Sequence, residues 1–212
     1  MSIITIPINL VRVVEIREVE KESPTVKTFT FQDRLCGKAK PGQFLMVWIP
    51  GVDEVPMSLS AIRRDGCSAI TVAEIGEATK ALHKKKTGEK IGVRGPYGNG
   101  FTPSEGNVLI VAGGTGIAPL LPLIEILVKS SARITVIFGA GTSNELILLG
   151  RLEASLSGFN GKIIATTEDG SYGLRGLATH PMEELLRNER FDMVYTCGAE
   201  QMMDKVLLEL GS

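Results

Sequence analysis

The strongest chemical signal in the sequence is a run of glycines between an apolar strand and an apolar helix, in the segment VLIVAGGTGIAPLLPLIEIL. Gly113, Gly114 and Gly116 permit positive φ and a close approach of the backbone to a ligand. The backbone N–H groups of such a turn, and of the helix that follows, can receive a pyrophosphate. Pro119 suits the first turn of that helix. A tight strand-to-helix turn without a ligand places glycine at the same positions, so the motif alone is a hypothesis.

A second glycine-bearing turn occurs in AEIGEATKALHKK, where a strand is expected to end at Ile75. Thr79 could cap the short helix that is expected over residues 79–86. Its hydroxyl and the free N–H groups of the first helical turn could then hold another pair of phosphates. A plain helix cap explains the same residues, because Thr is common at that position.

One thiol follows an apolar strand at a position where a ligand ring could reach it. Cys197 and Gly198 come directly after the stretch FDMVYT, which is expected to be a parallel strand. Ligands of open α/β sheets bind beyond the carboxyl ends of the strands, so this thiol can face a substrate ring. A cysteine in such a place is also often a small packed apolar residue.

The composition is that of a soluble globular protein. Hydrophobic residues make up 43%, charged residues 22%, and the formal net charge is −1, which argues against a nucleic-acid partner. The apolar stretch over 108–128 is long enough to span a bilayer, but its glycines and prolines break a continuous helix, so no membrane association is expected. The amino terminus has no positive leader, which favours a cytoplasmic protein. Three widely spaced cysteines fit neither a disulfide framework nor a metal site.

The first half of the chain reads as short strands separated by turn residues. Six strands at this spacing predict a small antiparallel barrel or sandwich, and of the two we expect a six-stranded antiparallel barrel. The expected strands span 11–19, 26–31, 43–49, 57–62, 69–75 and 90–94.

The second half changes period, because each compact apolar strand is followed by a segment with helical spacing. Such a βαβ series predicts an α/β doubly wound parallel sheet with helices on both faces. The expected strands span 107–112, 133–138, 162–165 and 191–196. Turn-forming residues over 102–106 suggest a hinge, and we expect one domain over 1–103 and a second over 104–212.

The order of the motifs along the chain is more specific than any one of them. PMSLS, GEAT, GPYGNGF, GGTGIAP, EDGSYG and CGAEQMM follow one another over two domains of the expected types. Together they resemble the ferredoxin-NADP reductase superfamily, and within it the electron-transfer subunits of dihydroorotate dehydrogenase. The resemblance covers Val11 to Leu210. It implies an amino-terminal FAD-binding barrel and a carboxyl-terminal NAD-binding domain, whose ligands meet where hydride moves to the flavin.

The resemblance also implies which residues touch each cofactor. Those matching the flavin site are Pro56, Met57, Ser58, Leu59, Ser60, Thr71, Val72, Ala73 and Glu74, with the pyrophosphate turn at Gly76, Ala78 and Thr79. Those matching the nicotinamide pyrophosphate loop are Gly113, Gly114, Thr115, Gly116 and Pro119. Cys197 and Gly198 match the pair that borders the nicotinamide at the site of hydride transfer.

Three features depart from the pattern of this family. Val55 stands where the family usually has an arginine, which would make a charge-assisted phosphate contact. Ala78 takes the place of a glycine. The subunits usually carry a cysteine-rich tail that binds a [2Fe–2S] cluster after the last helix, and the three cysteines of this sequence cannot supply the four thiolate ligands.

The choice of nicotinamide depends on the residues near the adenosine 2′ position. Glu168 and Asp169 follow the third strand of the second half, and no Arg or Lys occurs between them and Arg175. Because a carboxylate accepts a hydrogen bond from a free 2′-hydroxyl and repels a phosphate, we expect NADH rather than NADPH as the donor.

The expected function is electron transfer between NAD(H) and an FMN-containing dihydroorotate dehydrogenase subunit of pyrimidine biosynthesis, through a bound FAD, in a hetero-oligomer. A second possibility keeps the fold and changes the acceptor to ferredoxin, an oxygenase or a hydrogenase. A third is a flavin-bearing regulatory subunit without catalysis. Nothing in the sequence supplies a catalytic triad or a general-base pair, so the cofactors are expected to carry the redox chemistry.

Overall fold

The computed structural model describes residues 7–159 and 161–211, and the chain separates into two compact units after Phe101. The expectation about the amino terminus concerns residues 1–6 as well, which lie outside the described residues. Among the described residues, no helix is both long enough and apolar enough to cross a membrane.

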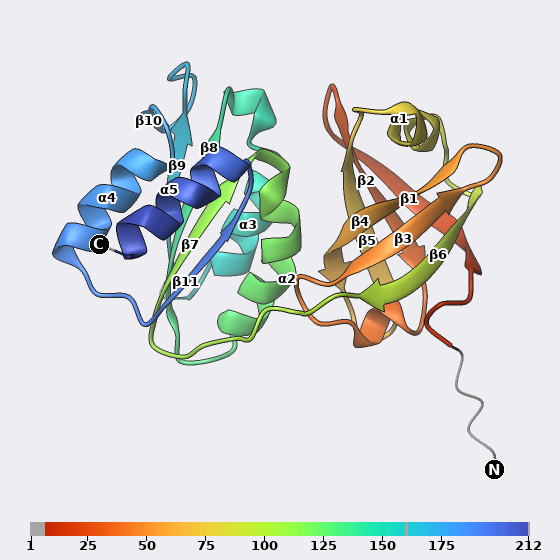
Figure 1. Ribbon diagram of the computed structural model, residues 1–212, viewed down its shortest axis with the longest axis horizontal. Helices are drawn as coiled ribbons and strands as arrows, with labels where there is room; N and C mark the ends of the chain where they lie inside the picture. Colours follow the sequence, from red (N-terminus) through yellow and green to blue (C-terminus); the bar gives the residue numbers. More distant parts are fainter. Residues whose placement is uncertain (1–6, 160, 212) are drawn as a thin grey trace, which may run out of the picture. The chain divides into compact units, whose positions relative to one another are not determined.

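The first unit is a closed barrel of six antiparallel strands in the order β1-β2-β5-β4-β3-β6 (Figure 1). The strands are β1 (Arg12–Ser23), β2 (Val26–Gln32), β3 (Phe44–Ile49), β4 (Asp53–Ile62), β5 (Cys67–Ala73) and β6 (Lys90–Tyr97). Since β1 pairs with β6, the sheet closes on itself. The predicted six-stranded barrel is therefore confirmed.

Alternation along each strand decides which side chains fill the barrel and which cover its outer face. In β3, Leu45 and Val47 are fully buried. Val47 pairs with Val55 of β4, and Val55 packs against the same core. Met46 pairs with Pro56, so these two residues share the outer face of the barrel.

The short helix α1 (Glu77–His83) packs against β3 and β4 and contributes Ala78 and Leu82 to the barrel core. The expected helix over 79–86 was placed too late in the chain. Gly76 is the N-cap, and Thr79 is the third helical residue, where its side chain bonds back to the Gly76 N–H.

The start of β4 also differs from the expectation. The strand begins at Asp53 rather than at residue 57, because residues 53–56 pair with 46–49 of β3. Two acidic residues and a proline lie at this end of β4, so an apolar pattern does not predict that the strand begins there.

The second unit is a five-stranded parallel sheet in the order β10-β9-β8-β7-β11. The strands are β7 (Asn107–Gly113), β8 (Arg133–Ala140), β9 (Gly161–Thr167), β10 (Leu174–Arg175) and β11 (Met193–Cys197). The helices are α2 (Ile117–Leu127), α3 (Leu149–Leu156), α4 (Thr179–Asn188) and α5 (Glu200–Leu210). Figure 1 shows α2 and α3 on one face of the sheet and α4 and α5 on the other. The predicted doubly wound α/β fold is confirmed.

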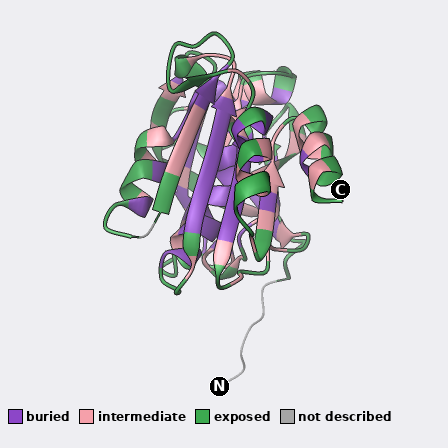
Figure 2. Ribbon diagram, turned by 90° about the vertical axis from the view of Figure 1, so that its left-hand side faces the viewer, coloured by how far each residue is buried: buried purple, intermediate pink, exposed green. Residues whose placement is uncertain are grey.

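The centre of this sheet is buried on both faces. Figure 2 shows the two central strands, β7 and β8, almost wholly buried. Leu109 and Val111 pack with Met182 of α4 and Val206 of α5. A continuous apolar run is what a strand with two covered faces requires, and it is the pattern that identified these strands in the sequence.

Two details of the second unit depart from the expectation. The two-residue strand β10 pairs with the end of β9 and was not foreseen. The boundary between the units lies after Phe101, two residues before the expected one. The Phe101 N–H donates to the carbonyl of Pro41 at 2.7 Å, whereas the carbonyl of Thr102 accepts a hydrogen bond from Tyr195 at 2.6 Å.

Candidate functional site

In the second unit, glycines bring two turns into contact at the carboxyl edge of the sheet. Gly113 ends β7, and residues 114–116 form a single 3₁₀ turn before α2 begins. A Cβ on Gly116 would overlap the carbonyl oxygen of Cys197, and a Cβ on Gly198 would lie 2.9 Å from the Gly113 nitrogen. Glycine is therefore required here for packing, and the packing places Cys197 beside the glycine turn.

The outer side of the same turn is open. Gly114 has φ of 51°, and an added Cβ there would meet no atom within 4 Å. Thr115 beside it is exposed. A backbone with positive φ and free space above it is the arrangement that lets N–H groups approach a phosphate.

Two buried hydroxyls at this edge have no hydrogen-bond partner among the described residues. They are Oγ1 of Thr166, near the end of β9, and Oγ1 of Thr196, next to Cys197 on β11. Buried polar atoms without a partner are uncommon in folded proteins. Open space at Gly114 together with these two unsatisfied oxygens fits a polar, phosphate-bearing dinucleotide bound along the edge.

Cys197 is half-buried at the end of β11. Burial raises the pKa of its thiol above the ordinary value, and the neighbouring backbone at Gly198 offsets this only in part. The thiol is therefore neutral near pH 7, which suits a contact with an uncharged part of a ring better than nucleophilic attack.

The remaining predicted residues of this unit play different parts. Pro119 is buried in the first turn of α2, so it shapes the helix start. Asp169 is exposed, and its Oδ1 accepts hydrogen bonds from the Ser171 backbone at 2.9 Å and from the Ser171 hydroxyl at 2.6 Å, which lowers the Asp169 pKa. Glu168 is exposed beside it. Two carboxyl side chains thus stand at the carboxyl end of β9.

In the first unit, Thr79 folds the turn that precedes α1. Its hydroxyl oxygen accepts hydrogen bonds from the N–H groups of Ile75 and Gly76, each at 2.9 Å, and donates to the Gly76 carbonyl at 3.0 Å. An added Cβ on Gly76 would meet no atom within 4 Å. Because the Thr79 hydroxyl is engaged by the turn, a phosphate at this position would be held by backbone N–H groups.

Ala78 explains how the chain tolerates a side chain where a glycine was expected. The residue is 7% exposed and belongs to the barrel core. Its methyl group therefore points away from the open side of the turn, and it fills space in the core.

The residues predicted along β4 and β5 divide into two groups. Leu59, Ser60 and Val72 are buried and Met57 packs against the barrel core, so these side chains support the strands from within. Those with at least partial exposure and no place in the core are Pro56, Ser58, Thr71, Ala73 and Glu74. Only this second group can offer side-chain atoms to a ligand on the outer face.

A ladder of hydroxyl groups crosses four strands on the outer face and was missed in the sequence. Ser60 bonds with Thr71 at 2.9 Å, Thr71 with Thr28 at 2.8 Å, and Thr28 donates to Glu22 at 2.6 Å. Thr28 lies directly opposite Thr71 in the register of β2 and β5. Polar residues alternate with apolar ones in these strands, but this pattern identifies the ladder only once the strand pairing is known.

An ion pair on β4 and β6 was also missed. Arg94 donates from Nε to Glu54 at 2.7 Å and from Nη2 to the second carboxylate oxygen. The two side chains are 31% and 22% exposed. The two side chains thus meet across β3, the strand that lies between β4 and β6.

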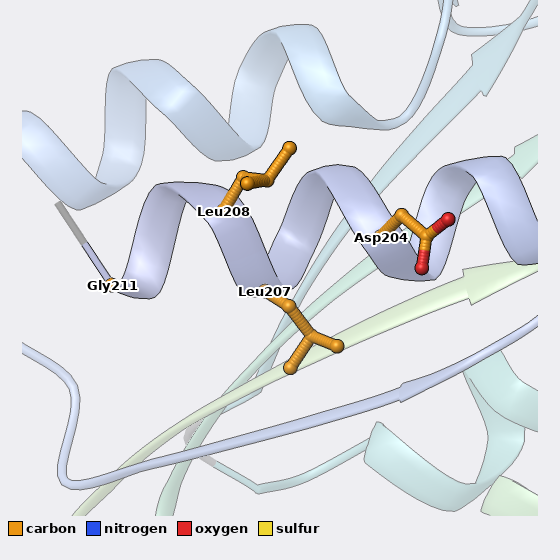
Figure 3. A pocket seen from close by; sticks show the side chains of 4 residues that line it. All are labelled: Asp204, Leu207, Leu208 and Gly211. Carbon is orange, nitrogen blue, oxygen red and sulfur yellow. The ribbon is translucent and has the colours of Figure 1, made fainter.

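The described part of the chain offers no metal site beside these turns. It contains no group of three or more His, Cys, Asp or Glu residues that could hold a metal ion. A surface pocket of about 540 Å³ lies on α5, lined by Asp204, Leu207, Leu208 and Gly211 (Figure 3). Asp204 is the only charged residue of these four, and its carboxylate would repel a phosphate.

Solved structures share this architecture. An NADH-dependent reduced ferredoxin-NADP oxidoreductase has a TM-score of 0.84 at 30% sequence identity, over 95% of this chain and 73% of that chain. The cytochrome b5 reductase domain of Ulva prolifera nitrate reductase has a TM-score of 0.76 at 17% identity, over 94% of this chain and 92% of that domain. The second shows the fold alone.

The family described as the oxidoreductase NAD-binding domain matches residues 110–207, which lie in the second unit. The fold and the turns at its carboxyl edge therefore define a flavin-dependent oxidoreductase of the ferredoxin-reductase type, which uses FAD and NAD(H) for electron transfer.

Relatives narrow this class further. A protein of Methanocaldococcus jannaschii named "Probable dihydroorotate dehydrogenase B (NAD(+)), electron transfer subunit" is 45% identical over 192 residues, covering 91% of this chain and 70% of the relative. A protein of the same name from Methanocella arvoryzae is 42% identical over 200 residues, covering 92% and 71%. The chain belongs to the family of the dihydroorotate dehydrogenase B electron transfer subunits, as the order of its motifs predicted.

Proposed function

We propose that FAD lies along the outer face of β4 and β5, with its pyrophosphate on the turn at 75–79. The at least partly exposed residues Pro56, Ser58 and Thr71 would then line the flavin, and Met57, Leu59 and Val72 would support them from the core. When bound, FAD supplies the step from hydride to single electrons. The residues of the barrel bind and orient it.

In the second unit, NAD(H) would bind at the carboxyl edge of the sheet. The N–H groups of 114–116 would hold its pyrophosphate, and Cys197 with Gly198 would border its nicotinamide. The observation that carries this proposal is the contact between the two glycine turns, which leaves Gly114 open and the Thr196 hydroxyl unsatisfied. A ligand carbonyl or amide group could complete that hydrogen bond.

The redox partner would be an FMN-containing dihydroorotate dehydrogenase subunit, joined to this chain in a cytoplasmic hetero-oligomer. The relative from Methanocaldococcus jannaschii is named as an electron transfer subunit of that enzyme, and this chain matches 70% of its length. A subunit so named requires a second subunit that holds the substrate site, and the described residues of this chain offer two cofactor turns and no catalytic triad.

The test is a spectrum of the purified protein with and without NADH. A flavin spectrum that bleaches on addition of NADH is expected, and dihydroorotate dehydrogenase activity is expected once the partner subunit is added. A protein that stays colourless after incubation with FAD would contradict the proposal at its first step.

The choice of donor is tested by comparing kcat/KM for NADH and NADPH. Since Glu168 and Asp169 bring negative charge to the end of β9, a 2′-phosphate should be repelled there. We expect NADH to be preferred by at least about tenfold, corresponding to one unfavourable charge contact of roughly 1.4 kcal/mol. Glu168→Gln should narrow the preference, and a clear preference of the unaltered protein for NADPH would contradict this assignment.

A second function is favoured by one comparison. The structure that is 30% identical to this chain is named as an NADH-dependent reduced ferredoxin-NADP oxidoreductase, which points to ferredoxin as an alternative acceptor. Reduction of ferredoxin by NADH at a rate higher than that of the dihydroorotate dehydrogenase subunit would favour this function. The reverse order of rates would favour the first.

A further inference from the structure

We infer that Arg94 of β6 is the cation that neutralises the FAD pyrophosphate on the barrel, and that Glu54 of β4 positions it. The inference rests on the proposed placement of FAD along β4. It assigns a role to two residues that lie outside every motif identified in the sequence.

The strand register places Arg94 on the correct face. Met46 pairs with Arg94 on one side and with Pro56 on the other, so the three residues form one row across β6, β3 and β4. Two strand spacings separate the ends of this row, roughly 10 Å. The hydrogen bonds from Arg94 to Glu54 span this gap, so the ion pair bridges β3 and lies next to β4, the strand along which FAD is proposed to lie.

The charge of Arg94 has no substitute on the neighbouring strands. Strands β3, β4 and β5 contain no Lys or Arg, as the segments FLMVWI, DEVPMSLSAI and CSAITVA show. The only other cation of β6 is Lys90, its first residue, which pairs with Glu15 of β1. Among these strands Arg94 is therefore the one cation beside β4, and Lys80 of α1 is a second cation, next to the turn at 75–79.

Arg94 also keeps donors for a ligand. Its guanidinium has five N–H donors, of which Nε and one on Nη2 bond to Glu54. The other three make no hydrogen bond within the described residues, and the side chain is 31% exposed. Glu54 thus fixes the plane of the guanidinium while its remaining edge faces solvent.

The two members of this ion pair should have opposite effects on FAD. Removing Arg94 removes a charge-assisted contact to phosphate, whereas removing the charge of Glu54 leaves the cation and takes away a competing anion. If the ion pair is purely structural, both changes should alter the Kd for FAD in the same direction, because either one breaks the pair and leaves one charge without its partner.

The experiment measures FAD dissociation constants of the full chain by flavin fluorescence for wild type, Arg94→Ala, Arg94→Lys and Glu54→Gln. We expect Arg94→Ala to raise the Kd about tenfold, Arg94→Lys to raise it less, and Glu54→Gln to leave it unchanged or lower it. The Kd of Arg94→Ala should also depend less on salt than that of wild type, since one phosphate contact is gone.

Arg17→Ala is the matched control, because Arg17 is an exposed arginine of β1 that bonds only to Gln32 in the described structure. Its Kd should equal that of wild type. An increase of the Kd in Glu54→Gln similar to that in Arg94→Ala, or an unchanged salt dependence, would overturn the inference. If Arg94→Ala fails to fold, the directions in which Arg94→Lys and Glu54→Gln change the Kd still decide whether the inference holds. Wild type that binds no FAD at all would instead reject the proposed function.

Discussion

At the scale of single residues, the barrel depends on a buried charge. Asp33 accepts hydrogen bonds from Arg12 at 2.7 and 3.2 Å and from the backbone N–H groups of Leu35 and Cys36. Arg12 reaches on to the Gly95 carbonyl at 3.0 Å. This cluster ties the start of β1 to the segment after β2 and to β6, and none of its residues is among the proposed cofactor contacts, so we expect its role to be stability.

The lowered pKa of Asp33 makes the contribution of this cluster to stability depend on pH. Burial opposes ionisation, but the hydrogen bonds from Arg12 and Cys36 outweigh it and lower the pKa below 3.8. A carboxyl that binds its proton less tightly when folded stabilises the fold above its unfolded pKa and loses that effect as pH falls through its folded pKa. Asp33→Asn should reduce the free energy of unfolding at pH 7 by roughly 2–3 kcal/mol.

Urea unfolding at a series of pH values checks this, and the gap between the two proteins should narrow as the pH falls below 3.8. Asp53→Asn is the control, since Asp53 is exposed and its carboxylate accepts only from the adjacent Glu54 N–H at 2.7 Å. A gap that stays constant down to low pH would show that the charge of Asp33 does not supply the stability.

Cys197 supports a second prediction at this scale. Its neutral thiol next to the glycine turn is proposed to border the nicotinamide, so Cys197→Ala should slow flavin reduction by NADH while leaving FAD bound. Loss of positioning contacts of this kind typically costs on the order of 1–3 kcal/mol, or about ten- to a hundredfold in rate. Stopped-flow measurements give the rate of flavin reduction, and an unchanged rate in Cys197→Ala would contradict the placement of Cys197 at the nicotinamide.

At the scale of elements, the glycine turn after β7 separates a packing role from a binding role. Gly116 has no room for a Cβ because the Cys197 carbonyl fills the space, whereas Gly114 has open space but φ of 51°. Gly116→Ala should force the two turns apart, lowering both stability and NADH affinity. Gly114→Ala should cost only about 1 kcal/mol of stability, from the left-handed backbone, while weakening NADH binding.

Calorimetry and NADH titration of the two variants separate these effects, with Gly150→Ala as control. Gly150 lies in α3, and an added Cβ there meets nothing within 4 Å. Alanine is the better helix former, so this change should leave NADH binding intact and not reduce stability. Equal losses in Gly114→Ala and Gly116→Ala would contradict the division of roles.

The sequence predicted elements well where one strong pattern governed them. The buried strands β7 and β8 and the alternating strands of the barrel were found because burial on one or both faces leaves a clear period. The start of β4 and the position of α1 were missed, since pairing with β3 and the bond from Thr79 back to Gly76 decide them. The Arg94–Glu54 pair and the hydroxyl ladder join residues on different strands, so only the closed register reveals them.

At the scale of the whole molecule, each unit has a hydrophobic core of its own. One core lies inside the barrel, and another lies between the sheet and helices α4 and α5. Units with separate cores can unfold separately. We therefore expect two unfolding transitions in the intact chain rather than one.

The single tryptophan makes this measurable. Trp48 lies on β3, so its fluorescence reports the barrel alone, whereas α2 to α5 give the second unit most of the helical far-UV circular dichroism. Urea curves followed by the two probes should not coincide. Addition of FAD should move only the fluorescence curve to higher urea, and NADH without FAD only the dichroism curve, since a ligand stabilises the unit that binds it. Coincident curves that shift together with either ligand would mean that the units fold as one body, and binding at either turn would then be coupled to the other.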